Sequence, residues 1–190
     1  MVLMTLTLAM TMGMAAIEEK PLVCPIAGSE VSKTSPAVEY AGTTYAFCCG
    51  NCPNTFAKDP KAIITKNAKA GKVIGVSLFD PISHNRIDVK KAKGSSDYMG
   101  TRYYFASTAN KVTFDKSSKK YSAVPKKESL TCAVMGTKIE SYSKAVSYVD
   151  HGGTRYYMCC AVCEPMMTKD PAKFAGKNVS EPSVRQVPKK

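Results

Sequence analysis

Apolar and polar residues alternate in two short segments, residues 37–40 and 43–47, on either side of an Ala-Gly dipeptide. This is the pattern of a β-hairpin whose glycine supplies the positive φ of a tight turn. A helical pattern follows, in which Pro53 is tolerated in the first turn and Phe56 and Ile63 form a buried side. The segment therefore predicts a hairpin followed by a helix, which an Asp-Pro pair breaks or kinks.

The same order of features occurs three times along the chain. The copies begin at Val38, Ser96 and Val149 and read VEYAGTTYAFCCGNCPNTFAKDPKAI, SDYMGTRYYFASTANKVTFDKSSKKY and VDHGGTRYYMCCAVCEPMMTKDPAKF. A short opening precedes each copy, namely CPIAG, DPISH and CAVMG. Because the order of features repeats as well as the composition, we expect tandem copies of one small unit.

The repeats predict an α+β protein made of three tandem β-hairpin-plus-helix units. We place these units at residues 17–67, 72–124 and 128–175. Short lysine-rich linkers separate them, and residues 176–190 are expected to form a flexible basic tail.

The first sixteen residues carry no charge and end in small residues. The run is short for a transmembrane helix and resembles a signal peptide cleaved after Ala15 or Ala16, although no Lys or Arg precedes it. We interpret residues 1–16 as a signal peptide, with an uncleaved anchor as the alternative. The protein is therefore expected to be exported, either to the periplasm or to the cell envelope.

The chain has 190 residues, a net charge of +12 and a hydrophobic share of 44%. Its lysines are scattered and accompany no nucleic-acid motif, which argues against nucleic acid as a partner. A lysine coat that keeps the protein soluble, or attraction to an anionic envelope surface, accounts for the charge. No acid–base pair, nucleophile arrangement or phosphate loop is apparent, so we do not expect an enzyme. The oligomeric state has no signature in the sequence.

Two of the three copies carry four cysteines each, and the middle copy carries none. Each set combines one cysteine in the opening with a C-C-x2-C group after the hairpin. A local pair plus a distant thiol is the usual arrangement of a thiolate site for zinc or another soft ion. We therefore expect about two ions of Zn²⁺ or Cu⁺ per chain. The two sets are Cys24, Cys48, Cys49 and Cys52, and Cys132, Cys159, Cys160 and Cys163.

The opening CPIAG, the turn AGTTYAFC, the C-x3-C pair and the following Phe and Asp-Pro resemble the YHS domain and the related TRASH metal-binding module. The resemblance covers roughly residues 20–66 and 128–175 well and residues 76–121 weakly. It implies a treble-clef-like fold and a role in metal sensing, trafficking or resistance. Carried over by position, the implied metal ligands are Cys24, Cys48 and Cys52, and Cys132, Cys159 and Cys163.

Three further residues stand outside this implied ligand set. Cys49 and Cys160 are extra neighbours of the C-x3-C pair, and adjacent side chains on extended backbone point in opposite directions, so sharing one ion requires a local turn. Met135 takes the place of a second opening cysteine that many family members carry. A thioether at Met135 would favour Cu⁺, and core packing is the alternative.

Disulfides are the main alternative to metal, because an exported chain meets oxidising conditions. Cys48 and Cys49 would then need separate partners among Cys24 and Cys52. A thiol-disulfide oxidoreductase is a further alternative. The chain has the C-x2-C spacing of such enzymes, but no thioredoxin-like βαβ pattern surrounds it.

For the function of the whole protein, we favour an exported soft-metal-binding protein in metal handling or resistance. The alternative function is that of a structural or assembly subunit of the envelope, in contact with other envelope proteins, whose cysteines form disulfides or structural zinc sites.

Overall fold

The computed structural model describes residues 19–32, 34–176 and 178–187, and it confirms the expected α+β class. Two sheets are present, one with six strands in the order β4-β5-β3-β2-β1-β9 and one with three in the order β6-β8-β7. The expected signal peptide, residues 1–16, lies outside the described residues. None of the helices in the described part of the chain has both the length and the apolar character needed to cross a membrane.

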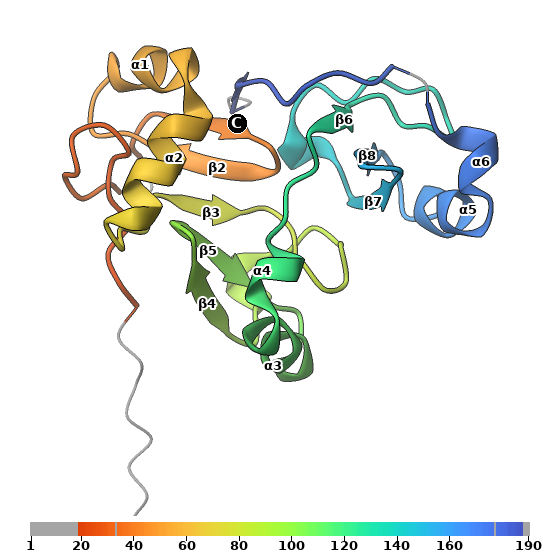
Figure 1. Cartoon of the computed structure of the whole chain (residues 1–190), viewed down its shortest axis with the longest axis horizontal. Coiled ribbons are helices and arrows are strands. Elements are labelled where there is room, and N and C mark those ends of the chain that lie inside the picture. The colour runs from red at the N-terminus through yellow and green to blue at the C-terminus, as the bar shows by residue number, and fades with distance from the viewer. Residues whose placement is uncertain (1–18, 33, 177, 188–190) are drawn as a thin grey trace, which may run out of the picture.

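Each of the three expected units contains a hairpin followed by two short helices (Figure 1). The helix pairs lie at the periphery and the strands between them. The first unit comprises β1 (Ala37–Tyr40), β2 (Thr43–Ala46), α1 (Cys52–Lys58) and α2 (Pro60–Lys69). The second comprises β3 (Gly75–Ser77), η1 (Val89–Lys91), β4 (Ser95–Tyr98), β5 (Thr101–Tyr104), α3 (Thr108–Lys116) and α4 (Ser118–Tyr121). The third comprises β6 (Lys127–Ser129), η2 (Tyr142–Lys144), β7 (Ser147–His151), β8 (Thr154–Met158), α5 (Cys163–Lys169) and α6 (Pro171–Phe174), and β9 (Arg185–Gln186) follows it.

The hairpin turns explain why glycine recurs at the same place in each unit. Gly42, Gly100 and Gly153 have φ values of 77°, 80° and 74°, and the residue before each is also at positive φ. Two consecutive residues at positive φ form a turn whose twist matches that of the flanking strands. The turn therefore sets the register of each hairpin, as in the pairing of Tyr40 with Thr43.

One fully buried helical side chain anchors the core of each unit. Phe56, Phe114 and Met167 occupy this position, and each is 0% exposed. Phe114 packs against the rings of Tyr103 and Phe105, with centroid distances of 4.8 and 5.3 Å. The cores are small, because only a few aromatic or methionine side chains surround each anchor.

Strand β3 joins the first two units into one sheet. It pairs in parallel with β5 and antiparallel with β2. Its first residue is Gly75, and a Cβ atom there would lie 2.8 Å from side-chain atoms of both Thr43 and Tyr45. Glycine is therefore required for this close approach. In the third unit, β6 pairs with β8 in the same parallel way.

Part of the segment 176–190, which the sequence predicts to be a flexible tail, pairs with the strands of the fold within the described residues. Gln186 in β9 pairs with Val38 in β1, and Ser180 pairs with Glu128 in β6. The hydroxyl of Tyr142 donates to the carbonyl oxygen of Ser183 over 3.2 Å. The tail therefore runs from the third unit back to the first, and its hydrogen bonds hold it in place.

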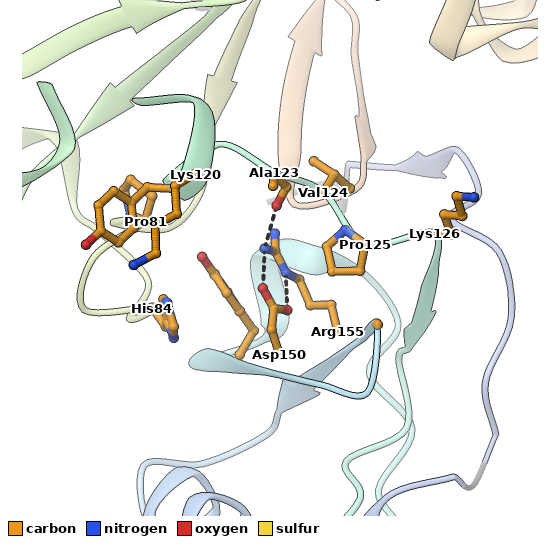
Figure 2. A pocket seen from close by; sticks show the side chains of 12 residues that line it. Pro81, His84, Lys120, Ala123, Val124, Pro125, Lys126, Asp150 and Arg155 are labelled. Atoms are coloured by element: carbon orange, nitrogen blue, oxygen red, sulfur yellow. Dashed lines mark hydrogen bonds and ion pairs between the residues drawn. The ribbon is translucent and has the colours of Figure 1, made fainter. Parts of the chain in front are cut away.

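An arginine from the repeated GTRYY motif links each of the last two hairpins to the chain before it. Arg155 donates to both carboxylate oxygens of Asp150 over 2.8 Å and to the carbonyl oxygen of Ala123 over 3.3 Å (Figure 2). Arg102 makes the same bidentate pair with Asp97 and donates to the carbonyl oxygen of Lys20. These arginines are structural, because their donors are taken up by the fold.

Replacing Arg155 with Met should lower the free energy of unfolding by about 2 kcal/mol, because Asp150 and the Ala123 carbonyl lose their donor. Urea unfolding followed by circular dichroism measures the change. Lys138→Met is the matched control, because the side chain of Lys138 is 71% exposed in its pair with Glu140 and should contribute less than about 0.5 kcal/mol. Equal losses in the two variants would contradict the structural role of Arg155.

Candidate metal centre

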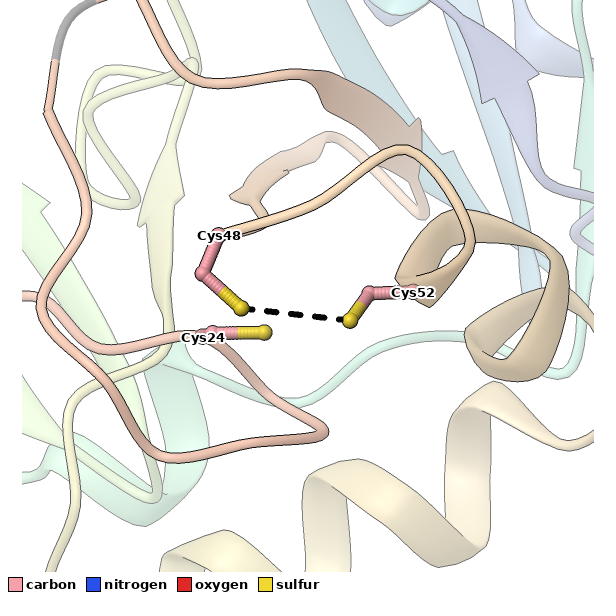
Figure 3. A group of neighbouring side chains, drawn as sticks. All are labelled: Cys24, Cys48 and Cys52. Atoms are coloured by element: carbon pink, nitrogen blue, oxygen red, sulfur yellow. Dashed lines mark hydrogen bonds between the residues drawn. The ribbon is translucent and has the colours of Figure 1, made fainter.

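Three cysteines of the first unit meet although they come from separate parts of the chain. Cys24 lies in the opening loop, Cys48 follows β2 and Cys52 is the first residue of α1 (Figure 3). Their sulfur atoms all lie within 4.8 Å of one another, and the Cys48 and Cys52 sulfurs are 4.0 Å apart. Cys24 and Cys52 are buried, whereas Cys48 is exposed. The fold therefore forms a partly shielded group of three thiols.

The opening loop holds its cysteine in place by backbone hydrogen bonds. The amide of Cys24 donates to the carbonyl oxygen of Ser29 over 2.7 Å, and the amide of Gly28 donates to the carbonyl oxygen of Cys24 over 2.9 Å. Gly28 has a φ of 75°, which closes the turn. The opening motif is thus a tight loop that points its cysteine toward the start of α1.

The third unit repeats this group with Cys132, Cys159 and Cys163, whose sulfur atoms also lie within 4.8 Å of one another. Cys132 donates its amide to the carbonyl of Thr137 and accepts from the amide of Gly136, each over 2.8 Å. The helices that carry Cys52 and Cys163, α1 and α5, lie on opposite sides of the molecule in Figure 1. The chain therefore holds two separate groups of three thiols that could each bind an ion.

The fourth cysteine of each unit lies beside the group rather than within it. The sulfur of Cys49 is 2.8 Å from that of Cys52, and the sulfur of Cys160 is 2.7 Å from that of Cys163. Neither belongs to the sets of three whose sulfurs are mutually close. Met135 is 60% exposed, so core packing does not account for it.

Backbone amides favour the ionised form of both opening cysteines. Burial opposes ionisation of Cys24, but the backbone amides of Ala27, Cys48 and Ile26 outweigh it and lower the pKa of this thiol to about 7. The pKa of Cys132 is lowered in the same way, against burial, by backbone amides that include those of Cys159 and Met135. Thiolate is the form that binds a metal ion.

The helical cysteines have the opposite tendency. The hydrogen bond with Cys49, together with burial, raises the pKa of Cys52 to about 12. Burial and the contact with Cys160 also raise the pKa of Cys163. A soft cation among the three sulfurs would offset this cost by stabilising thiolate at the buried position.

In the cysteine-free middle unit, a carboxylate connects the opening loop, the end of the second hairpin strand and the start of the helix. Asp80 stands where the outer units have Cys24 and Cys132, and it is 1% exposed. Its Oδ2 accepts from the amide of Ala106 over 2.8 Å and from Nδ2 of Asn110 over 2.7 Å. Ala106 and Asn110 occupy the positions of Cys48 and Cys52 in the repeat.

The other oxygen of Asp80 closes the opening loop. Oδ1 accepts from the amides of Ile82 and Ser83 over 2.8 and 3.3 Å. One buried carboxylate therefore ties the opening loop, the end of the second hairpin strand and the start of the helix together. The aligned repeats place Asp80 and Asn110 where the outer units have cysteine, and the hydrogen bond between them is visible only in the folded structure.

A cavity of about 550 Å³ lies between the second and third units (Figure 2). The ring of Tyr148 is stacked on His84 with a centroid distance of 4.6 Å, and the Arg155 guanidinium lies 3.8 Å from its centre. Burial lowers the pKa of His84, which favours the neutral imidazole. Within the described residues, the two groups of three cysteines are the potential metal-binding clusters, and neither lines this cavity.

Replacing Asp80 with Ala should reduce the free energy of unfolding by about 3 kcal/mol, because the part-buried donors on Ala106, Asn110 and Ile82 lose a buried, charged acceptor. Urea unfolding of the full chain measures this loss. Asp88→Ala is the control: Asp88 is exposed and accepts only locally, from the amide of Lys90, so its loss should stay near 1 kcal/mol. A result in which the two variants lose the same stability would contradict the cross-linking role of Asp80.

Comparison with known proteins identifies one segment. The family model of the YHS domain matches residues 80–124. No curated protein and no solved structure matches the chain. The matched segment is the middle, cysteine-free copy, for which the sequence resemblance was the weakest of the three. The outer copies repeat its hairpin, opening loop and helix. Residues 80–124 therefore match the YHS domain, and this segment is flanked on both sides by units of the same construction that carry the cysteines.

Proposed function

We propose that this protein binds one soft metal ion, Cu(I) or Zn(II), in each of its two outer units. The observation that carries the proposal is the convergence of one distant cysteine on a C-x3-C pair, which brings three sulfurs within 4.8 Å of one another in both outer units. Thiolate is the ligand that Cu(I) and Zn(II) prefer over the oxygen ligands of Mg²⁺ or Ca²⁺. The ligands of the two ions are Cys24, Cys48 and Cys52, and Cys132, Cys159 and Cys163.

The middle unit supports this proposal by contrast. Asp80 completes the junction of its unit with hydrogen bonds of 2.7–3.3 Å. In the first unit the junction holds sulfurs, and the contact of Cys48 with Cys52 is 4.0 Å long. A sulfur contact of this length is a weak hydrogen bond at best. A metal ion among three thiolates would restore a cross-link of comparable strength.

The exposure of the sites favours exchange of the ion over permanent burial. Cys48 is exposed and Cys159 half-buried, so an acceptor can approach each site from solvent. Three thiolates suit Cu(I), whereas a closed structural zinc site has four protein ligands. We therefore propose a role in metal handling or resistance. The apolar first sixteen residues support a location outside the cytoplasm.

The second candidate function is that of an envelope scaffold whose cysteines only brace the fold. The 2.8 Å contact between Cys49 and Cys52 favours this alternative, because these two sulfurs lie close enough to form a disulfide with little movement. Thiol titration of protein purified without reductant separates the two. Eight thiols that are free or protected by metal support metal binding, and four or fewer support the scaffold, because closing Cys49–Cys52 and Cys160–Cys163 leaves four thiols.

The reduced protein should bind two equivalents of Cu(I) or Zn(II), and Cys52→Ser should bind one. The remaining equivalent belongs to the third unit, which lies on the other side of the molecule from α1. Metal analysis after anaerobic reconstitution and desalting measures the stoichiometry. Asn51→Ser is the control, because it changes the exposed neighbour of Cys52 and should leave two equivalents bound. A Cys52→Ser protein that still binds two ions would exclude the assigned ligands.

A third site should appear when the middle unit receives the three cysteines of its neighbours. The triple variant Asp80→Cys, Ala106→Cys and Asn110→Cys replaces the carboxylate network by thiols at positions that the repeat makes equivalent. We expect three bound equivalents, measured by the same metal analysis. The control is Asp80→Cys alone, which supplies one thiol and should leave the stoichiometry at two. A triple variant that folds and binds only two ions would show that converging thiols are insufficient.

A further inference from the structure

Each outer unit contains a second sulfur pair that uses a sulfur of the proposed metal site. Cys52 lies 4.0 Å from Cys48, within the group of three, and 2.8 Å from Cys49, outside it. In the third unit, Cys163 belongs to the group of three and lies 2.7 Å from Cys160. In each outer unit, the buried helical cysteine can therefore either coordinate the metal ion or form a disulfide with the fourth cysteine.

The middle unit indicates that the fourth cysteine is dispensable for the fold. Ser107 stands where the outer units have Cys49 and Cys160, and its hydroxyl accepts from the amide of Asn110 over 3.1 Å. A small polar residue at this position is thus sufficient for the junction. The cysteine at this position in the outer units therefore supplies a reactive thiol that the fold itself does not require.

From this geometry we infer that Cys49–Cys52 and Cys160–Cys163 are dithiol pairs whose oxidation to disulfides excludes the metal ion. The inference rests on the proposed function for its consequence, metal release, whereas the pairs themselves are defined by the sulfur contacts. A disulfide has an S–S bond of about 2.0 Å, so closing the pair requires a shift of less than about 1 Å. Cys52 would then be unable to coordinate the ion.

The exposure of the two sulfurs sets the order of the reaction with a low-molecular-weight disulfide, RSSR. Cys49 is exposed and Cys52 is buried, so the oxidant reaches Cys49 first. The Cys49 thiolate attacks one sulfur of RSSR, which forms a mixed disulfide and releases RS⁻. The Cys52 thiolate then attacks the Cys49 sulfur and releases the second RS⁻. Two cysteine sulfurs are oxidised, RSSR is reduced to two thiols, and these take up the two protons of Cys49 and Cys52.

The site that remains after oxidation has too few ligands. Cys24 and Cys48 keep their thiols, but the third sulfur of the group is now part of the disulfide. A site for Zn(II) has at least three protein ligands, so the other two thiols alone cannot hold this ion, and the expected release concerns the Zn(II)-loaded protein. The ion therefore leaves to a chelator or an acceptor protein, and reduction of the disulfide restores the site.

The test uses Zn(II)-loaded full-length protein treated anaerobically with oxidised glutathione in the presence of a chromogenic zinc chelator. The wild type should release both ions, Cys49→Ser should release one, and the double variant Cys49→Ser and Cys160→Ser should retain both. Because Ser107 occupies this position in the middle unit, the serine variants are expected to fold, and circular dichroism checks this. A double variant that releases its ions as fast as the wild type would overturn the inference.

A second measurement maps the bond without reference to metal. Free thiols of the oxidised protein are alkylated, the disulfides are reduced, and the newly exposed thiols receive a different label before mass spectrometry. We expect the second label on Cys49, Cys52, Cys160 and Cys163. The second label on Cys24 and Cys48 instead would overturn the pairing. Reduced wild-type protein that binds no metal would defeat the proposed function, while the label positions still decide the pairing.

Discussion

The junction where the opening loop, the end of the second hairpin strand and the start of the helix meet is the constraint on which each unit depends. The hairpin and the helix pack on a single buried anchor such as Phe56 or Phe114. The opening loop has backbone hydrogen bonds of its own, and its first residue is buried in each unit. Units this small cannot cover the loop by hydrophobic packing alone, so a local cross-link must hold it against the helix.

The chain uses two kinds of side chain at this junction: a carboxylate in the middle unit and thiols in the outer units. In the middle unit, the buried carboxylate of Asp80 accepts four hydrogen bonds and closes the junction with groups that cannot leave. In the outer units, thiols stand at the same three points, and thiols can hold an ion, exchange it or form a disulfide. The same fold therefore has one permanently closed unit between two units whose junctions can change state.

The arrangement of the units keeps the two cysteine groups apart while making the scaffold continuous. Strand β3 connects the first two units in one sheet, and the opening loop of the middle unit pairs with β7 of the third through Asn85 and Ser147. The tail adds β9 to the edge of the first unit. The closed middle unit thus pairs with both of its neighbours.

The sequence by itself determined the features that local chemistry encodes. Alternation and the turn glycines placed the first hairpin at residues 37–40 and 43–47, and it forms at Ala37–Tyr40 and Thr43–Ala46. The repeat placed the cysteines in two equivalent sets, because aligned copies of one unit bring aligned residues to the same points. Only the tertiary structure decided the parallel pairing of β3, the docking of the tail, the network around Asp80 and the contact of Cys49 with Cys52. These features depend on hydrogen bonds and contacts between residues whose partners leave no periodic pattern in the chain, so they become visible only once the backbone is in place.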